Sequence, residues 1–79
     1  ALSVINVNEI CGGSVYSLSA AIAAITEREN ADNVTYRKPG IVLTYKIAEG
    51  EWESKQFAGS SLEGFATEAN WTDFGATGR

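Results

Sequence analysis

One segment, residues 41–57, constrains the fold of this chain more than any other part of its sequence. It reads IVLTYKIAEGEWESKQF, in which two runs of strand-forming residues flank a central Glu49-Gly50 pair. Glycine reaches the positive φ angles of tight turns without steric cost, so this pair is typical of a two-residue hairpin turn. The segment therefore predicts a β-hairpin.

The length of the turn decides which side chains share a face of this hairpin. A two-residue turn pairs Ile47 with Trp52, and it gathers a mostly apolar face that consists of Leu43, Tyr45, Ile47 and Trp52. A three-residue loop ending in Gly50, with a β-bulge, shifts every pair by one residue. We take the first register as the leading expectation and keep the second as its alternative.

A helix is predicted over residues 18–29. Leu18, Ile22 and Ile25 recur at helical spacing, and the alanines between them have high helix propensity. Ser17 precedes this run and can accept hydrogen bonds from the free N–H groups of the first helical turn. The apolar stripe of the helix is expected to pack on the apolar face of the hairpin.

Shorter signals flank these two elements. Ile5 and Val7 alternate with asparagines, which predicts a short edge strand that ends at the glycine pair 12–13. Near the other end, Leu62 and Phe65 have helical spacing and predict one or two helical turns.

Together these elements predict an α+β fold, in which a small antiparallel sheet (a β-hairpin plus an N-terminal strand) packs on one α-helix, with a short C-terminal helical turn. The 79 residues are expected to form a single small domain, with a core at 3–75 and a frayed tail or linker at 76–79. Because the chain begins at Ala1 without an initiator methionine, we expect it to be part of a longer chain.

The composition argues against most enzyme chemistry. The chain has no histidine and one cysteine, so it lacks an internal disulfide, a Ser–His–Asp or Cys–His arrangement, and a zinc site of paired thiolates and imidazoles. Cys11 has no basic neighbour in sequence that would lower its pKa, so we interpret it as a packing residue. We expect no catalytic residue, no cofactor and no metal.

The charge and hydropathy of the chain argue against two classes of partner, nucleic acids and membranes. The net charge is −4 and the six basic residues are scattered, whereas a nucleic-acid-binding surface is usually basic. The longest apolar run, residues 20–25, is far shorter than the ~20 residues that span a bilayer. Neither a nucleic acid nor a membrane is therefore an expected partner.

Acidic residues offer an enzymatic alternative. A pair of carboxylates can perform glycoside hydrolysis, and Glu49, Glu51 and Glu53 surround the hairpin tip. Alternating glutamates at such a tip usually form a solvated face, which is the interpretation we favour.

Three aromatic residues are candidates for contact with a partner or ligand: Tyr45, Trp52 and Trp71. Tryptophan and tyrosine on an open surface can anchor a protein contact or stack on a sugar ring. The alternative is that these side chains fill the core, because a domain this small needs large apolar groups to fill it.

A Gly-Gly turn leads to VYSLSAAIAAI, followed by YRKPGIVLTYK, EWESKQF and FATEANWTDFG. This order of landmarks resembles small modules of tail and tail-fibre proteins of Bacteroidales phages and prophages. The matching positions in the first half are Gly13, Tyr16, Leu18, Ala21, Ile22 and Ile25. Those in the second half are Arg37, Gly40, Tyr45, Trp52, Gln56, Phe57 and Trp71. Phe65 stands where the resemblance leads us to expect tryptophan.

The resemblance implies a non-enzymatic structural or attachment module located in the virion tail. It implies a homo-oligomer, with a trimer as one form, or contact with neighbouring domains of a longer chain, and a host-surface glycan as a further partner. It carries over no catalytic residue. The alternative is a bacterial surface or secreted interaction module that binds carbohydrate through exposed aromatics.

Overall fold

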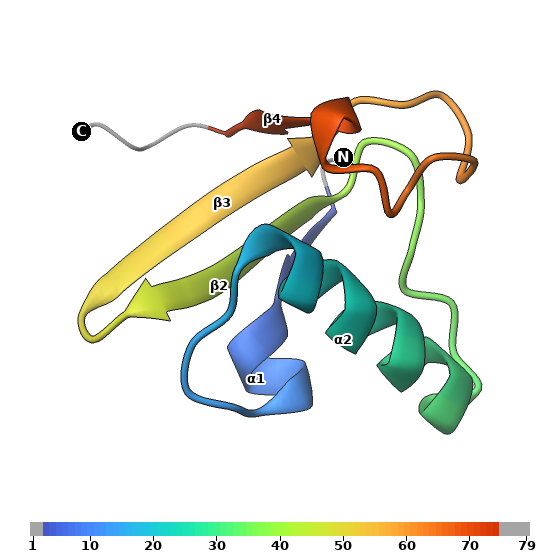
Figure 1. Ribbon diagram of the computed structural model, residues 1–79. Coiled ribbons are helices and arrows are strands. Elements are labelled where there is room, and N and C mark those ends of the chain that lie inside the picture. Colours follow the sequence, from blue (N-terminus) through green and yellow to red (C-terminus); the bar gives the residue numbers. More distant parts are fainter. Residues whose placement is uncertain (1–2, 75–79) are drawn as a thin grey trace.

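A computed structural model describes residues 3–74 and shows an α+β domain, which confirms the predicted fold class (Figure 1). The expected tail at 76–79 and the last residue of the expected core lie outside the described residues. The elements in chain order are β1 (Val4–Asn6), α1 (Val7–Cys11), α2 (Leu18–Asp32), β2 (Val42–Ala48), β3 (Glu51–Phe57), the 3-10 turn η1 (Glu68–Asn70) and β4 (Trp71–Asp73).

The four strands form one mixed sheet in the order β1-β2-β3-β4. The hairpin β2–β3 and the pair β3–β4 are antiparallel, but β1 runs parallel to β2. The expectation of a wholly antiparallel sheet was therefore wrong for the N-terminal strand. The helices α1 and α2 lie between β1 and β2 in the chain, and such a crossover returns the chain to the end at which β1 begins.

The hairpin adopts the register of the alternative prediction. Tyr45 pairs with Glu53 and Lys46 with Trp52, whereas the leading prediction paired Ile47 with Trp52 and was wrong. The turn itself is still Glu49-Gly50, with Gly50 at a φ of 76°, and the shift arises at a bulge between Lys46 and Ala48. Because side chains alternate along a strand, this shift moves Trp52 to the face opposite Tyr45.

The helix α1 replaces the second half of the expected N-terminal strand. The Asn6 side chain accepts a hydrogen bond from the Glu9 N–H at 3.0 Å, which caps the helix at the point where the strand was expected to continue. Val7 is fully buried, as its apolar character predicts, but it is buried as a helical residue.

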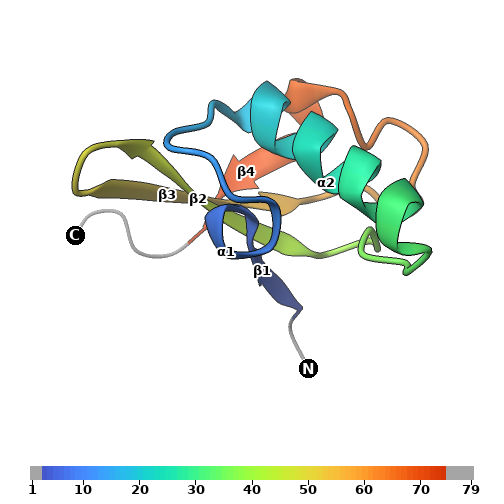
Figure 2. The same ribbon diagram turned by 90° about the horizontal axis from the view of Figure 1, so that it is seen from below.

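The helix α2 confirms the predicted helix and extends it to Asp32. The Ser17 hydroxyl accepts from the Ala20 N–H at 3.2 Å, and Asn33 ends the helix in the left-handed region with a φ of 56°. Figure 2 shows α2 lying across one face of the sheet.

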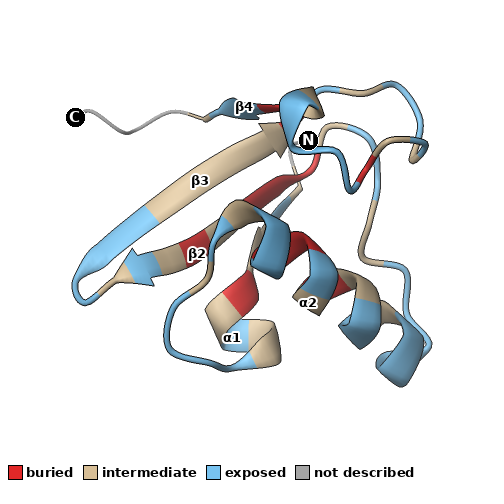
Figure 3. Cartoon of the chain, viewed as in Figure 1, coloured by how far each residue is buried: buried red, intermediate tan, exposed pale blue. Residues whose placement is uncertain are grey.

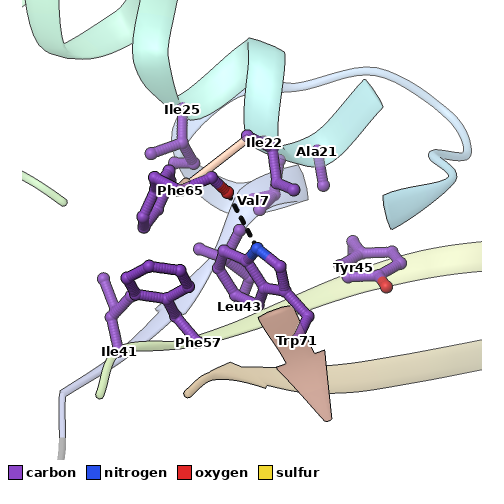
Figure 4. Close-up of a cluster of buried hydrophobic side chains, with 10 residues drawn as sticks. All are labelled: Val7, Ala21, Ile22, Ile25, Ile41, Leu43, Tyr45, Phe57, Phe65 and Trp71. Carbon is purple, nitrogen blue, oxygen red and sulfur yellow. Dashed lines mark hydrogen bonds between the residues drawn. The ribbon is translucent and has the colours of Figure 1, made fainter. Parts of the chain in front are cut away.

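The core lies between α2 and this face of the sheet. Figure 3 shows where the buried residues lie along the chain, among them segments of α1, α2 and β2. The buried members of the core are Val7, Ala21, Ile22, Ile25, Ile41, Leu43, Tyr45, Phe57, Phe65 and Trp71 (Figure 4). The predicted packing of Leu43 and Tyr45 with Ile22 and Ile25 is therefore confirmed. It does not include Ile47 and Trp52, which are 39% and 48% exposed.

Trp71 completes an aromatic group with Phe57 and Phe65. Its ring centroid lies 5.3 Å from that of Phe57 and 5.1 Å from that of Phe65, and its Nε1 donates to the Phe65 carbonyl at 2.8 Å. Phe65 itself lies in a turn closed by its N–H and the Leu62 carbonyl. The predicted C-terminal helical turns thus correspond to this turn and to η1. The strand β4 was not predicted from the sequence.

The strand β2 extends beyond the short strand β1, and there α1 and the loop after it provide hydrogen-bond partners for the free edge of β2. The Lys46 N–H donates to Asn8 Oδ1 at 2.8 Å, and the Lys46 carbonyl accepts from the Tyr16 N–H at 2.7 Å. The Asn8 amide also donates to the Gly13 carbonyl at 3.1 Å. The Asn8 side chain therefore links α1, the loop that follows it and the strand β2.

Candidate functional site

The structure separates the three aromatic candidates. Tyr45 and Trp71 are buried in the core, whereas Trp52 on β3 is 48% exposed. The three side chains therefore do not form a common platform. Of the three, Trp52 is positioned to touch a partner.

Trp52 lies on the face of the sheet that points away from α2. The pairing of the strands places there the residues that alternate with the core positions, and we call this set the open face: Val4, Asn6, Val42, Thr44, Lys46, Trp52, Ser54, Gln56 and Thr72. No helix within residues 3–74 covers this face (Figure 2). Val42 is buried, and the other members are half-buried or exposed.

The part of the open face toward the hairpin tip combines an indole, a cation and hydroxyl groups. Lys46 Nζ lies 5.8 Å from the centroid of the Trp52 ring, which is a cation–π arrangement between directly paired residues. The next pair along the hairpin is Thr44 and Ser54, whose hydroxyl oxygens are 2.9 Å apart. Beyond it, Gln56 Nε2 donates to the Gly40 carbonyl at 3.1 Å.

Charge is distributed unequally between the two faces of the sheet. Lys46 is the only charged member of the open face, although the chain carries a net charge of −4. The strand carboxylates belong to the other alternation: Glu53 accepts from the Tyr45 hydroxyl at 2.7 Å, and Asp73 forms an ion pair with Lys55. Lys46 is therefore the single charge among the open-face residues, and it lies next to the hairpin tip, where Glu49 and Glu51 are exposed.

The hairpin tip is a solvent-exposed acidic segment, as predicted. Glu49 and Glu51 are exposed, and Glu53 is half-buried beside Tyr45. Within residues 3–74 no group of three or more Cys, Asp or Glu side chains is arranged to hold a metal ion.

The Tyr45 hydroxyl is the buried titratable group of this region. Burial raises its pKa well above the usual value for tyrosine, and the hydrogen bond to Glu53 acts in the same direction. The hydrogen bond to Asp73 raises the pKa of the Lys55 ammonium. Both groups thus hold their protons more firmly in the folded chain than in the unfolded one.

We expect stability to fall above about pH 10, and Tyr45→Phe to reduce that fall. The unfolded chain releases the tyrosine proton near this pH while the folded chain retains it, so unfolding becomes more favourable by up to about 1.4 kcal/mol per pH unit. The contribution of the Tyr45 hydroxyl to folding stability is fully present below that pH and is lost as the pH rises above it. Urea-unfolding midpoints measured from neutral to strongly alkaline pH check this. Because Lys55 is present in both proteins, equal slopes would show that Tyr45 does not hold its proton.

Cys11 lies outside the open face, in a shallow pocket of about 300 Å³ beside α2. Its thiol lies 3.6 Å from the Ala24 carbonyl, and burial raises its pKa, although the nearby Arg28 acts in the opposite direction. A protonated, half-buried thiol is consistent with the predicted packing role.

A polar cluster fastens the end of α2 to the connector that leads to β2. Arg37 Nε lies 2.7 Å from Glu29 Oε1, and the Tyr36 hydroxyl donates to Asp32 at 2.8 Å. The hydrogen bond from Arg37 lowers the pKa of Glu29, and that from Tyr36 lowers the pKa of Asp32. Sequence reasoning missed this cluster, and its arrangement indicates a structural role.

Comparisons with protein-family models, with curated proteins and with solved structures found no match to this chain. None of the helices in the described part of the chain has the length and apolar character needed to cross a membrane. The residues of the open face are thus the basis on which a function can be proposed.

Proposed function

We propose that this domain is a non-enzymatic attachment module that binds its partner through the open face. The observation that carries this proposal is the half-exposed Trp52 near the hairpin tip, on a sheet face that no described helix covers. A large indole left in water forgoes the stabilisation that burial provides, and tryptophan is the residue most enriched at the energetic centres of interfaces.

Rigidity supports the same role. Trp52 and Lys46 are directly paired across the hairpin, and their strands continue into the buried core through Leu43, Tyr45 and Phe57. A partner that binds here meets side chains whose backbone is already fixed, so little conformational entropy is lost on binding.

The resemblance to phage modules supplies the proposed setting. It favours a tail-type protein of a phage or prophage, in which the domain acts beside copies of itself or neighbouring domains in the virion. A bacterial surface or secreted module is the alternative setting. The open face serves attachment in both settings, and the sequence flanking this domain in its parent chain distinguishes them.

A cell-binding assay tests attachment. The biotinylated domain is displayed on fluorescent streptavidin, since several copies raise a weak affinity through effective concentration. Intact Bacteroidales cells are then measured by flow cytometry. We expect binding by the wild type and loss of binding by Trp52→Ala. Val34→Ala is the matched control, because Val34 is also half-exposed but lies in the connector after α2, outside the open face.

Two results would contradict the proposal. One is an absence of binding to any strain of a broad panel. The other is equal binding by the Trp52 and Val34 variants, which would place the attachment surface elsewhere.

A further inference from the structure

We infer that the open face binds a saccharide residue that carries a single carboxylate. The inference rests on the proposed attachment function and names the chemical class of its ligand. It is built from three features of the neighbouring pairs Lys46–Trp52 and Thr44–Ser54.

The first feature is a flat apolar surface at the hairpin-tip end of a polar face. The Lys46 ammonium lies toward the Trp52 ring, and the indole still keeps 48% of its surface exposed. The C–H groups on one face of a sugar ring can pack on such a surface, while the hydroxyl groups at the rim of the ring stay free for hydrogen bonds.

The second feature is the hydroxyl pair beside the indole. Each hydroxyl of Thr44 and Ser54 has one donor and two acceptor sites, so their mutual hydrogen bond leaves acceptor sites free. The two pairs are two residues apart along the strands, a separation of about 7 Å. A ring stacked on Trp52 therefore has polar partners within reach at its rim.

The third feature is charge. Lys46 is the single charge of the open face, and the strand carboxylates belong to the opposite alternation: Glu51, Glu53 and Asp73. A ligand with one carboxylate pairs with this ammonium in a charge-assisted hydrogen bond. A polyanion such as nucleic acid meets only one cation here and is repelled by the net charge of −4.

Two-dimensional NMR of the ¹⁵N-labelled domain tests the inference. The probes are oligogalacturonides and sialyllactose, each compared with a neutral counterpart, the galacturonide methyl ester or lactose. We expect the acidic sugars to shift the Trp52 indole N–H signal and the backbone signals of the open face. The indole N–H of Trp71, which is hydrogen-bonded in the core, should stay in place.

Single substitutions distinguish the contact of the sugar with Lys46 from its contact with Trp52. Lys46→Gln should weaken binding of the acidic sugar by about tenfold, the size expected for loss of a charge-assisted hydrogen bond, and should bring it to the level of the neutral counterpart. Lys38→Gln removes an exposed lysine from the connector before β2 and should leave binding unchanged. Trp52→Ala should abolish the shifts for every sugar.

Each contrary result has a distinct meaning. If neutral and acidic sugars bind equally, the carboxylate is not recognised. If no acidic sugar shifts the open face while cells still bind through Trp52, the ligand class is wrong and the attachment function stands. If cells do not bind either, both proposals fail. If Trp52→Ala converts an oligomer into a monomer in light scattering, the face joins copies of this chain and the saccharide inference is overturned.

Discussion

Replacing Trp71 with alanine should remove most or all of the stability of this domain, so that about half or more of the molecules are unfolded at 25 °C. The side chain is 6% exposed, packs against Phe57 and Phe65, and donates its indole N–H to a buried carbonyl. Loss of a buried tryptophan costs about 3–5 kcal/mol, which equals the roughly 3–5 kcal/mol that a core of this size supplies. Urea unfolding followed by far-UV circular dichroism measures the effect.

The other tryptophan is the matched control. Trp52→Ala removes the same side chain from an exposed position and should change the free energy of unfolding by at most about 1 kcal/mol. Trp71→Phe should lie between the two, since it keeps a ring in the aromatic group and loses the hydrogen bond to Phe65. Equal destabilisation by the two alanine variants would contradict the placement of Trp71 in the core.

Truncation of Ile25 should have the second largest effect. Ile25 is fully buried in the middle of α2, where the helix meets the sheet. Ile25→Ala should cost about 2–5 kcal/mol and Ile25→Val about 0.5–1.5 kcal/mol. The higher helix propensity of alanine offsets a few tenths of a kcal/mol of this loss. Denaturation midpoints of the two variants give a graded series.

Val34→Ala is the control for this series. Val34 is a half-exposed β-branched residue just after α2, so its truncation should change the free energy of unfolding by about 0.5 kcal/mol or less. A mild effect of Ile25→Ala, comparable with that of Val34→Ala, would mean that α2 does not pack on the sheet as described.

The elements with strong local signals were predictable. The helix α2 begins directly after Ser17, as the capping residue indicates, and its buried positions Ala21, Ile22 and Ile25 follow the helical period. The hairpin also lies where the Glu49-Gly50 pair places it. In these segments the sequence pattern and the tertiary packing favour the same structure.

The short elements were not predictable because distant residues stabilise them. The strand β4 has three residues and depends on pairing with β3, and α1 has five residues that were read as the rest of a strand. Asn8 belongs to the same class, since its partner Lys46 is 38 residues away in sequence. An isolated sequence window contains none of these contacts.

The binding surface was predicted only in part, for a geometric reason. Trp52 was among the candidates, but the leading register placed it on the same face as Tyr45 and toward the helix. The bulge between Lys46 and Ala48 reverses that relation and brings Lys46 opposite Trp52 instead. A shift of one residue thus decides which side chains form the open face, and the Glu-Gly turn does not encode it.

The separation of the two tryptophans onto opposite sides of the sheet is tested most directly by acrylamide quenching of single-tryptophan variants. Trp71→Phe leaves Trp52 as the only indole, and Trp52→Phe leaves Trp71, with circular dichroism confirming that both variants fold. We expect the fluorescence of Trp52 to be quenched several times more strongly than that of Trp71. Equal quenching, or stronger quenching of Trp71, would contradict the existence of an open face that exposes Trp52.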